Sequence, residues 1–390
     1  MLFASITAAA GQWLVLALAA KLGSAEMVGQ LALALAIVAP IQTLTDLSLR
    51  PAFATDARSE YHFRDYASLR GIGIAIALVA GVAAALWNGS ARWVILAVSL
   101  QKATESASDL LFGLFQKEGH LQWTGQSIVL RSIASSLVFA LTLVTTSSLP
   151  AACFSGVLIR LGLLAALDTK RAVPLLANQF TGTRSGSSAL LQSSLPLAAG
   201  LFLLSFTVNI PRYFLGHRTG VAALGVFAAL LYVFQAGAML VDSIGQAGSV
   251  RLAQCHARQD SRAFQMLTLQ LLGGAALAAL AGIAIAATAG ETLLRLIYSS
   301  TFASHNGVFL LLSLASLPWY CSSILGYALI ARRQMRALFL CQAASFAVTA
   351  AAAYWNIGAE IESASYVVIA TYTTQCLLYL AALFLRGKRT

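Results

Sequence analysis

Long stretches without a formally charged residue restrict the fold of this chain more than any other feature of its sequence. A helix needs about 20 consecutive, predominantly apolar residues to cross the hydrocarbon core of a bilayer. Charged residues make up only 10% of the 390 residues, against roughly 25% in soluble domains. The uncharged stretches are Met1–Ala20, Met27–Thr45, Gly71–Ala91, Ser132–Ile159, Ser185–Pro211, Thr219–Val241, Ala263–Gly290, Leu296–Ala331, Ala337–Ala359 and Ser363–Leu385. The sequence therefore predicts a protein that is solvated mainly by lipid.

Two further helices complete the predicted topology. The stretch Ser132–Ile159 is interrupted by the turn signal Ser147–Pro150, so its two parts belong to different helices. Trp93–Gln116 is apolar apart from three charged residues, and its neighbours lie on consistent sides of the membrane only if it also crosses. We therefore predict an all-α integral membrane protein with about twelve transmembrane helices.

The basic residues follow the positive-inside rule. The chain has 25 Lys and Arg against 14 Asp and Glu, a formal charge of +11. With the N-terminus in the cytoplasm and alternating connections, most Lys and Arg fall in cytoplasmic loops. They are spread over several short loops without a recognisable motif, which disfavours nucleic-acid binding. We expect both termini in the cytoplasm and no nucleic-acid partner.

An internal repeat indicates two lobes of six helices. One offset along the chain aligns Gly29 with Gly225 and Asp46 with Asp242. Halves with an even number of helices have the same orientation, so a pseudo-twofold axis along the membrane normal would relate them. We predict an N-terminal lobe at residues 1–168, a cytoplasmic linker at 169–187 and a C-terminal lobe at 188–390.

Catalytic and metal-binding patterns are weak in this sequence. The largest predicted external connection, Gly290–His305, contains no paired carboxylates for acid–base chemistry. The five cysteines lack CxxC spacing and the five histidines lack an HExxH pattern. We therefore expect neither enzyme activity nor a metal or organic cofactor.

Several motifs resemble a known family of membrane transporters. The run Gly29–Arg50 and the following Phe63–Tyr66 resemble the second helix and its loop in polysaccharide flippases of the Wzx type. Asn209–Gly216, followed by Ala223–Phe227, resembles that family's signature at the seventh helix, and Gly290–Tyr298 resembles the outer end of the ninth. These flippases belong to the multidrug/oligosaccharidyl-lipid/polysaccharide exporter (MOP) superfamily. The sequence lacks the basic N-terminal tail common in the family, which favours a start further upstream.

The resemblance implies both a fold and a function. It implies two six-helix bundles around a V-shaped central cavity, a geometry suited to alternating access, in the bacterial inner membrane. It also implies that the chain flips undecaprenyl-pyrophosphate-linked oligosaccharides in polysaccharide or O-antigen biosynthesis, coupled to H⁺ or Na⁺. The implied partners are membrane lipids, a polysaccharide polymerase and chain-length proteins. The alternatives are a drug or small-metabolite exporter of the same superfamily and a membrane enzyme or structural subunit of a glycan assembly complex.

Polar residues inside the predicted spans are candidates for substrate binding, because they are costly in lipid and usually face a bundle interior. Lys102, Arg131 and Arg160 would give the N-terminal lobe a basic interior suited to a diphosphate. Asn209 and Arg212 lie on one helical face, and Arg212 matches the family signature. The alternatives are neutralisation within the lobe or snorkelling for the first three residues, and a headgroup anchor for Arg212.

Five charged residues are candidates for ion coupling or for a gate. Asp46 and Asp242 are expected at the inner ends of repeat-related helices, where a carboxylate could exchange a proton or bind a cation. Asp46 and Arg50 are spaced i, i+4, which favours a structural ion pair at an inner gate. Glu105 and Asp109 lie deeper in a predicted span and are therefore the stronger candidates for coupling.

Aromatic residues suggest two contacts with the membrane surface. The segment Arg50–Arg70 mixes charged and aromatic residues, as an amphipathic helix on the inner leaflet does, with an ordinary loop helix as the alternative. Most tryptophans, Trp319 among them, are expected in an aromatic belt, with sugar stacking as the alternative.

Overall fold

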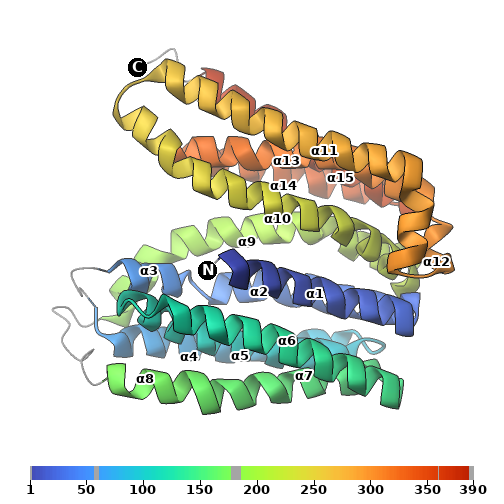
Figure 1. Ribbon diagram of the computed structural model, residues 1–390, viewed down its shortest axis with the longest axis horizontal. Coiled ribbons are helices and arrows are strands. Elements are labelled where there is room, and N and C mark those ends of the chain that lie inside the picture. Colours follow the sequence, from blue (N-terminus) through green and yellow to red (C-terminus); the bar gives the residue numbers. More distant parts are fainter. Residues whose placement is uncertain (1, 57–60, 177–185, 359, 386–390) are drawn as a thin grey trace. The chain divides into compact units, whose positions relative to one another are not determined.

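The computed structural model describes residues 2–56, 61–176, 186–358 and 360–385. Every regular element in these residues is a helix, which confirms the predicted all-α class (Figure 1). The elements are α1 (Leu2–Leu22), α2 (Ala25–Thr45), α3 (Leu49–Thr55), α4 (Phe63–Trp87), α5 (Arg92–Lys117), α6 (Leu121–Thr146), α7 (Leu149–Leu163), a π-helical turn (Leu164–Asp168), α8 (Thr169–Leu176), α9 (Ser187–Thr219), α10 (Val221–Ala257), α11 (Ser261–Ile297), α12 (Ser300–Ala303), α13 (Asn306–Ala331), α14 (Met335–Asn356) and α15 (Ile361–Leu385).

The long helices correspond to the predicted spans. In the described part of the chain, ten helical stretches are long and apolar enough to cross a membrane. α1 adds a shorter apolar stretch, Ile6–Leu22, and α5 is the charged crossing that the topology requires. The chain is therefore a multi-pass membrane protein.

Local sequence signals set the ends of these helices. Ser24 caps α2 by accepting a hydrogen bond from the Met27 amide, and Asp260 caps α11 through the Ala263 amide at 2.8 Å. α6 ends at Thr146, and its C-cap Ser147 has a φ of 50°, which reverses the chain before α7 begins. The predicted turn between these two helices is thereby confirmed.

The helices pack into two compact units, Met1–Phe206 (unit 1) and Thr207–Thr390 (unit 2), and the division falls inside α9. The predicted linker at 169–187 begins as helix α8, which follows directly on α7 and the π-helical turn. Residues 177–185 of that linker lie outside the described residues. The lobe boundaries and the twofold relation between lobes remain predictions.

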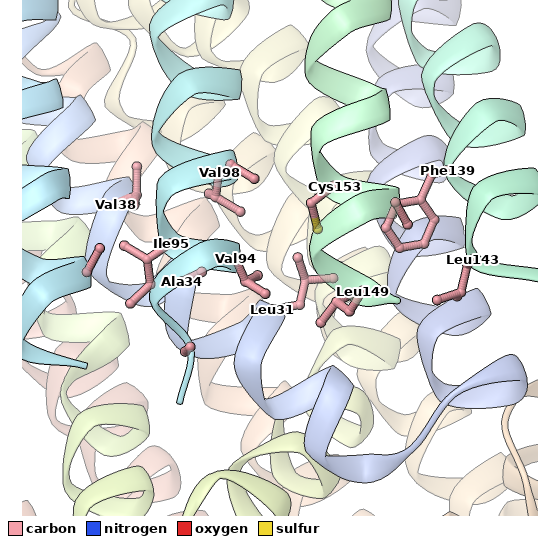
Figure 2. Packing of buried hydrophobic residues seen from close by; sticks show 14 residues of the cluster. Leu31, Ala34, Val38, Val94, Ile95, Val98, Phe139, Leu143, Leu149 and Cys153 are labelled. Atoms are coloured by element: carbon pink, nitrogen blue, oxygen red, sulfur yellow. The ribbon is translucent and has the colours of Figure 1, made fainter. Parts of the chain in front are cut away.

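An apolar core joins five helices of unit 1, α2 and α4 to α7. Figure 2 shows side chains of α2, α5, α6 and α7 converging, with Ile95 and Leu149 essentially inaccessible to solvent. The alanines among them, such as Ala34 of α2, allow helix backbones to approach closely. Close packing of this kind drives helix association in lipid, where the hydrophobic effect gives no net free energy of association.

A second core of unit 1 corrects the expectation for Arg50–Arg70. Only the short α3 and the start of α4 form in this segment, and residues 57–60 lie outside the described residues. Phe53 and Tyr66 are 1% and 2% exposed, and their ring centroids are 4.9 Å apart. The aromatic side chains therefore pack into protein, and an amphipathic helix with its aromatic face in the inner leaflet does not form.

Helix α13 is the central helix of unit 2, since it packs against α10, α11 and α15 (Figure 1). Two glycines of α10 permit this packing. A Cβ at Gly237 would lie 2.2 Å from the Tyr320 hydroxyl, and one at Gly245 would lie 2.5 Å from the Tyr327 ring. The Tyr320 hydroxyl donates a hydrogen bond to the carbonyl of Phe234 at 2.7 Å, so this buried hydroxyl has a hydrogen-bond partner.

Candidate functional site

A break after α2 separates two residues that the sequence predicted to pair. α2 ends at Thr45, and Leu47 and Ser48 both have φ of 50°, in the left-handed region. Arg50 therefore lies on α3 and not one turn beyond Asp46 on the same helix. The predicted ion pair between them is wrong, because i, i+4 neighbours meet only on a continuous helix.

Asp46 and Arg50 instead join a network that connects α2, α3, α4 and α5. Arg70 of α4 is 3% exposed, pairs with Asp46 and lies 3.6 Å from Asp109 of α5. Arg50 pairs with the same Asp109 at 3.0 Å, and Arg70 donates a hydrogen bond to Ser106 at 2.8 Å. The two guanidinium groups balance the two carboxylates. The sequence analysis assigned Arg70 to a cytoplasmic loop. It began each span at the first residue of an uncharged stretch, whereas α4 begins earlier, in residues that carry charge.

Glu105 is shared by two of the predicted substrate-binding cations. Lys102 Nζ lies 2.7 Å from Glu105 Oε2 on the same helix. Arg160 Nε of α7 lies 3.4 Å from Glu105 Oε1, and Gln101 Nε2 also donates to that carboxylate at 3.3 Å. This cluster is partly exposed and has one positive charge in excess.

Arg131 forms a buried pair with Asp168, a residue that sequence reasoning did not identify. Arg131 Nη2 lies 2.6 Å from Asp168 Oδ2, and the Asp168 side chain is fully buried. Ser127 donates to Asp168 at 2.7 Å, and Ser108 accepts from Arg131 at 2.8 Å. Asp168 was expected at the lobe boundary, but the π-helical turn after α7 places its side chain in the interior of unit 1. Its signal was a lone acid after the short apolar run Leu161–Leu167 that follows Arg160.

All three predicted cations of unit 1 therefore contact a carboxylate. The arrangement matches the neutralisation alternative more closely than a bare basic interior, because a buried charge is stabilised by a paired opposite charge. A role of Lys102, Arg131 and Arg160 in substrate binding remains a prediction.

Arg212 of α9 differs from the arginines of unit 1. Its side chain is 6% exposed, and its Nη1 donates a hydrogen bond to Asn209 Oδ1 at 2.8 Å. The guanidinium lies 5.5 Å from the centroid of the Tyr232 ring of α10. Its Nε has no hydrogen-bond partner, as is also true of Arg131 and Arg160, but among the described residues no carboxylate lies within ion-pairing distance of Arg212. Asn209 and Arg212 thus lie together, as their spacing predicted, around a cation without a counterion.

Aromatic side chains lie in the same unit as Arg212. The rings of Trp319 of α13 and Tyr372 of α15 are stacked, with centroids 4.7 Å apart and an interplanar angle of 8°. Trp319 lies near the middle of α13, so its expected place in an interfacial aromatic belt is wrong. Tyr232 and Tyr372 had no sequence signal, since they occur in otherwise apolar helices.

Asp242 lies within α10 and not at its end. The helix continues to Ala257, about 22 Å beyond Asp242 at 1.5 Å per residue. The expected place at a helix end is therefore wrong for Asp242, although Asp46 does cap α2. The sequence prediction failed because α10 continues through polar residues after the uncharged stretch that was used to set its end. Among the described residues, no cation is within ion-pairing distance of Asp242.

Comparisons with known proteins show which sequences and folds this chain resembles. No protein-family model matches the chain. The chain is 26% identical over 335 residues to the capsular polysaccharide biosynthesis protein CapF of Staphylococcus aureus, covering 85% of this chain and 84% of that protein.

Solved structures show which fold these helices form. An inward-facing multidrug resistance MATE family transporter of the MOP superfamily superimposes with a TM-score of 0.74, at 11% identity, over 97% of this chain and 93% of that one. The lipid II flippase MurJ in an inward closed conformation has a TM-score of 0.62, at 11% identity, over 98% and 87%. The resemblance first noticed in the sequence motifs is therefore confirmed, and the chain has the fold of the MOP superfamily of membrane transporters.

Proposed function

We propose that this protein flips undecaprenyl-pyrophosphate-linked oligosaccharides from the inner to the outer leaflet of the bacterial inner membrane by alternating access. The similarity to a capsular polysaccharide biosynthesis protein over most of both chains supports a substrate from polysaccharide assembly. The transporter fold, shared with a lipid II flippase, supports movement of a lipid-linked molecule over catalysis.

The lone buried charge of Arg212 carries this proposal. A buried guanidinium without a counterion is destabilising, and an anionic ligand removes that cost. The planar guanidinium binds phosphate oxygens through two parallel hydrogen bonds, so a diphosphate suits it better than a neutral sugar does. Trp319, which is partly exposed and stacks on the buried Tyr372, adds an aromatic ring in the same unit, and such a ring suits the apolar face of a sugar.

Ion coupling forms a further part of the proposal. Asp242 lies within α10 without a described cationic partner, and an unpaired carboxylate inside a membrane span marks an ion or proton pathway. We assign H⁺ or Na⁺ binding to Asp242 in preference to Asp46, Glu105 and Asp109, which are all ion-paired. Both termini lie in the cytoplasm in this scheme, and a polysaccharide polymerase and chain-length proteins take the product onward.

Reconstitution tests the flippase directly. Purified protein in liposomes containing labelled undecaprenyl-pyrophosphate oligosaccharide should accelerate the appearance of label in the opposite leaflet. Arg212→Gln should slow flipping at least about tenfold, the effect of losing a charge-assisted bond, and Arg212→Lys should restore only part of the rate. Arg295→Gln is the matched control, because Arg295 is 65% exposed and paired with Glu291 on the surface. A folded wild-type protein that flips no faster than empty liposomes contradicts the function.

A drug or small-metabolite exporter is the second candidate, favoured by the TM-score of 0.74 to a multidrug transporter. The same liposomes distinguish the two, since an exporter would move soluble organic compounds and leave the lipid-linked oligosaccharide in place. The uncompensated positive charge of Arg212 argues against organic cations as substrates.

A further inference from the structure

Helix α11 has two opposite faces, one packed into unit 2 and one left open. The packed face contains buried residues of small and large size: Phe264, Thr268, Ala275 and Ala279. The open face carries a stripe of large apolar side chains that are 52–69% exposed: Met266, Leu269, Leu277 and Leu280. Their spacing of i, i+3, i+11 and i+14 keeps them on one side of a helix with 3.6 residues per turn. In a helix able to cross a membrane, such a stripe is lipid-facing.

Arg262 lies at the start of this stripe. It precedes Met266 by four residues and Leu269 by seven, so the three side chains share one helical face. Arg262 is exposed, as is Arg258, four residues earlier across the turn between α10 and α11. The helical rise puts Leu269 about 10 Å from Arg262 along the axis, within the roughly 15 Å of hydrocarbon in one leaflet. Arg262 therefore lies at headgroup depth when Met266 and Leu269 lie among acyl chains.

The charge of these two arginines is not balanced by a nearby acid. Between Asp242 and Glu291 the sequence contains one acid, Asp260. Its carboxylate accepts a hydrogen bond from the Ala263 amide at 2.8 Å as the N-cap of α11. Among the described residues, no carboxylate lies within ion-pairing distance of Arg258 or Arg262. In unit 1, by contrast, Asp46 and Asp109 offset two of the arginines.

Further arginines raise the positive charge at this end of unit 2. Arg332, after α13, lies 4.5 Å from the centroid of the Phe264 ring of α11 and donates a hydrogen bond to the Leu383 carbonyl of α15 at 2.9 Å. The start of α11 and the ends of α13 and α15 therefore meet here (Figure 1). Two more exposed arginines follow within four residues: Arg333 and Arg336. Their positive potential extends over about 10 Å in physiological salt and attracts anions to the start of α11.

The place of these residues in the membrane selects the occupant. The positive-inside rule assigns this end of unit 2 to the cytoplasm, where anionic headgroups attract basic residues beside a span. The planar guanidinium matches the oxygens of a phosphodiester, and the stripe matches the acyl chains below it. A soluble acidic protein would bind the arginines but leave Met266 and Leu269 uncovered. A zwitterionic phospholipid carries its own cation and gains less from the positive potential.

We propose that Arg258, Arg262 and the lipid-facing stripe of α11 bind an anionic phospholipid of the inner leaflet. The headgroup contacts the two arginines, and the acyl chains lie along Met266 and Leu269. The bound lipid supplies the negative charge that this end of unit 2 lacks and holds α11 at a fixed depth in the bilayer. This inference rests on the membrane topology given with the proposed function and is independent of the transported substrate.

Lipid binding to the purified protein tests the site. Native mass spectrometry in detergent measures dissociation constants for phosphatidylglycerol and phosphatidylcholine with identical acyl chains. Phosphatidylglycerol should bind at least about tenfold more tightly, and Arg258→Gln combined with Arg262→Gln should abolish this preference, because the two guanidinium groups favour the headgroup with net negative charge. Arg258→Lys combined with Arg262→Lys should retain most of the preference, since the charge remains. An undiminished preference in the glutamine variant overturns the proposal.

Arg295→Gln is the matched control for charge. Arg295 is an exposed arginine near the other end of α11, and it is paired with Glu291 at 2.7 Å. Its replacement should leave the lipid preference unchanged, because Glu291 already compensates its charge. An equal loss of preference in Arg295→Gln overturns the assignment to Arg258 and Arg262, since any arginine would then serve.

A crosslinking experiment on the wild-type protein does not depend on the folding of the variants. Phosphatidylglycerol with a photoreactive acyl chain should label the part of α11 around Met266 and Leu269 more strongly than phosphatidylcholine with the same chain does. Equal labelling of this segment by the two probes overturns the proposal. Displacement of phosphatidylglycerol by a soluble polyglutamate peptide also overturns it and indicates an acidic protein as the occupant.

The binding data separate this inference from the flippase. A protein that moves no lipid-linked oligosaccharide but prefers phosphatidylglycerol through Arg258 and Arg262 contradicts only the function. A protein that flips the oligosaccharide and binds the two phospholipids equally well contradicts only the lipid site.

Discussion

At the scale of single residues, the interior arginines differ in how their charge is compensated. Arg131 has Asp168 as a fully buried partner, Arg160 shares Glu105, and Arg212 has only an amide oxygen and an aromatic ring. Arg131 and Arg160 thus each have a carboxylate partner within the protein, and Arg212 is the one of these three without one. This difference favours a structural role for the first two and a binding role for Arg212.

The buried Arg131–Asp168 pair yields a prediction for stability. Arg131→Met should lower the free energy of unfolding by about 3–5 kcal/mol, because Asp168 keeps a buried charge without its partner. The double variant Arg131→Met with Asp168→Leu should recover most of this loss. Thermal unfolding of the purified variants in detergent measures both effects. An unchanged midpoint in Arg131→Met would show that Asp168 does not need its partner.

At the scale of elements, two positive-φ residues determine which charges meet. Because Leu47 and Ser48 end the continuity of α2, Arg50 turns toward Asp109 of α5, and Asp46 is left to Arg70 of α4. The resulting network joins four helices at one end of unit 1. Such a network holds only if α4 and α2 are in close contact there.

A glycine of α4 provides a test of that contact. A Cβ at Gly73 would lie 2.4 Å from the carbonyl oxygen of Thr45, at the end of α2, and a backbone atom cannot move aside cheaply. Gly73→Ala should therefore separate the helices and lower the unfolding midpoint, with a loss of about 1–3 kcal/mol. Gly71→Ala on the same helix is the control, since its Cβ would meet nothing within 4 Å. Equal midpoints for the two variants would contradict the close approach.

At the scale of the whole molecule, the formal net charge of +11 is explained by membrane topology more than by ligand binding. Acids offset all but one of the ion-paired cations inside unit 1, and the remaining basic residues lie mostly in the connections assigned to the cytoplasm. The excess charge should therefore anchor the orientation of the chain.

Cysteine labelling tests this orientation. In a background without the five native cysteines, Arg333→Cys in the connection between α13 and α14 should react with a membrane-impermeant reagent only after the cytoplasmic side is opened. Asn88→Cys, between α4 and α5, should react in intact cells. Labelling of position 333 from outside would reverse the predicted topology.

The sequence by itself determined the helix number, the turn at Ser147 and the all-α membrane class, because the thickness of a bilayer translates directly into the length of an uncharged run. It also placed Asn209 beside Arg212, since neighbours on one helical face need no tertiary information. Only the tertiary structure decided that Arg70 pairs with Asp46 and that Asp168 pairs with Arg131. Those contacts join helices far apart in the chain, and the packing of side chains, which no local pattern encodes, brings them together.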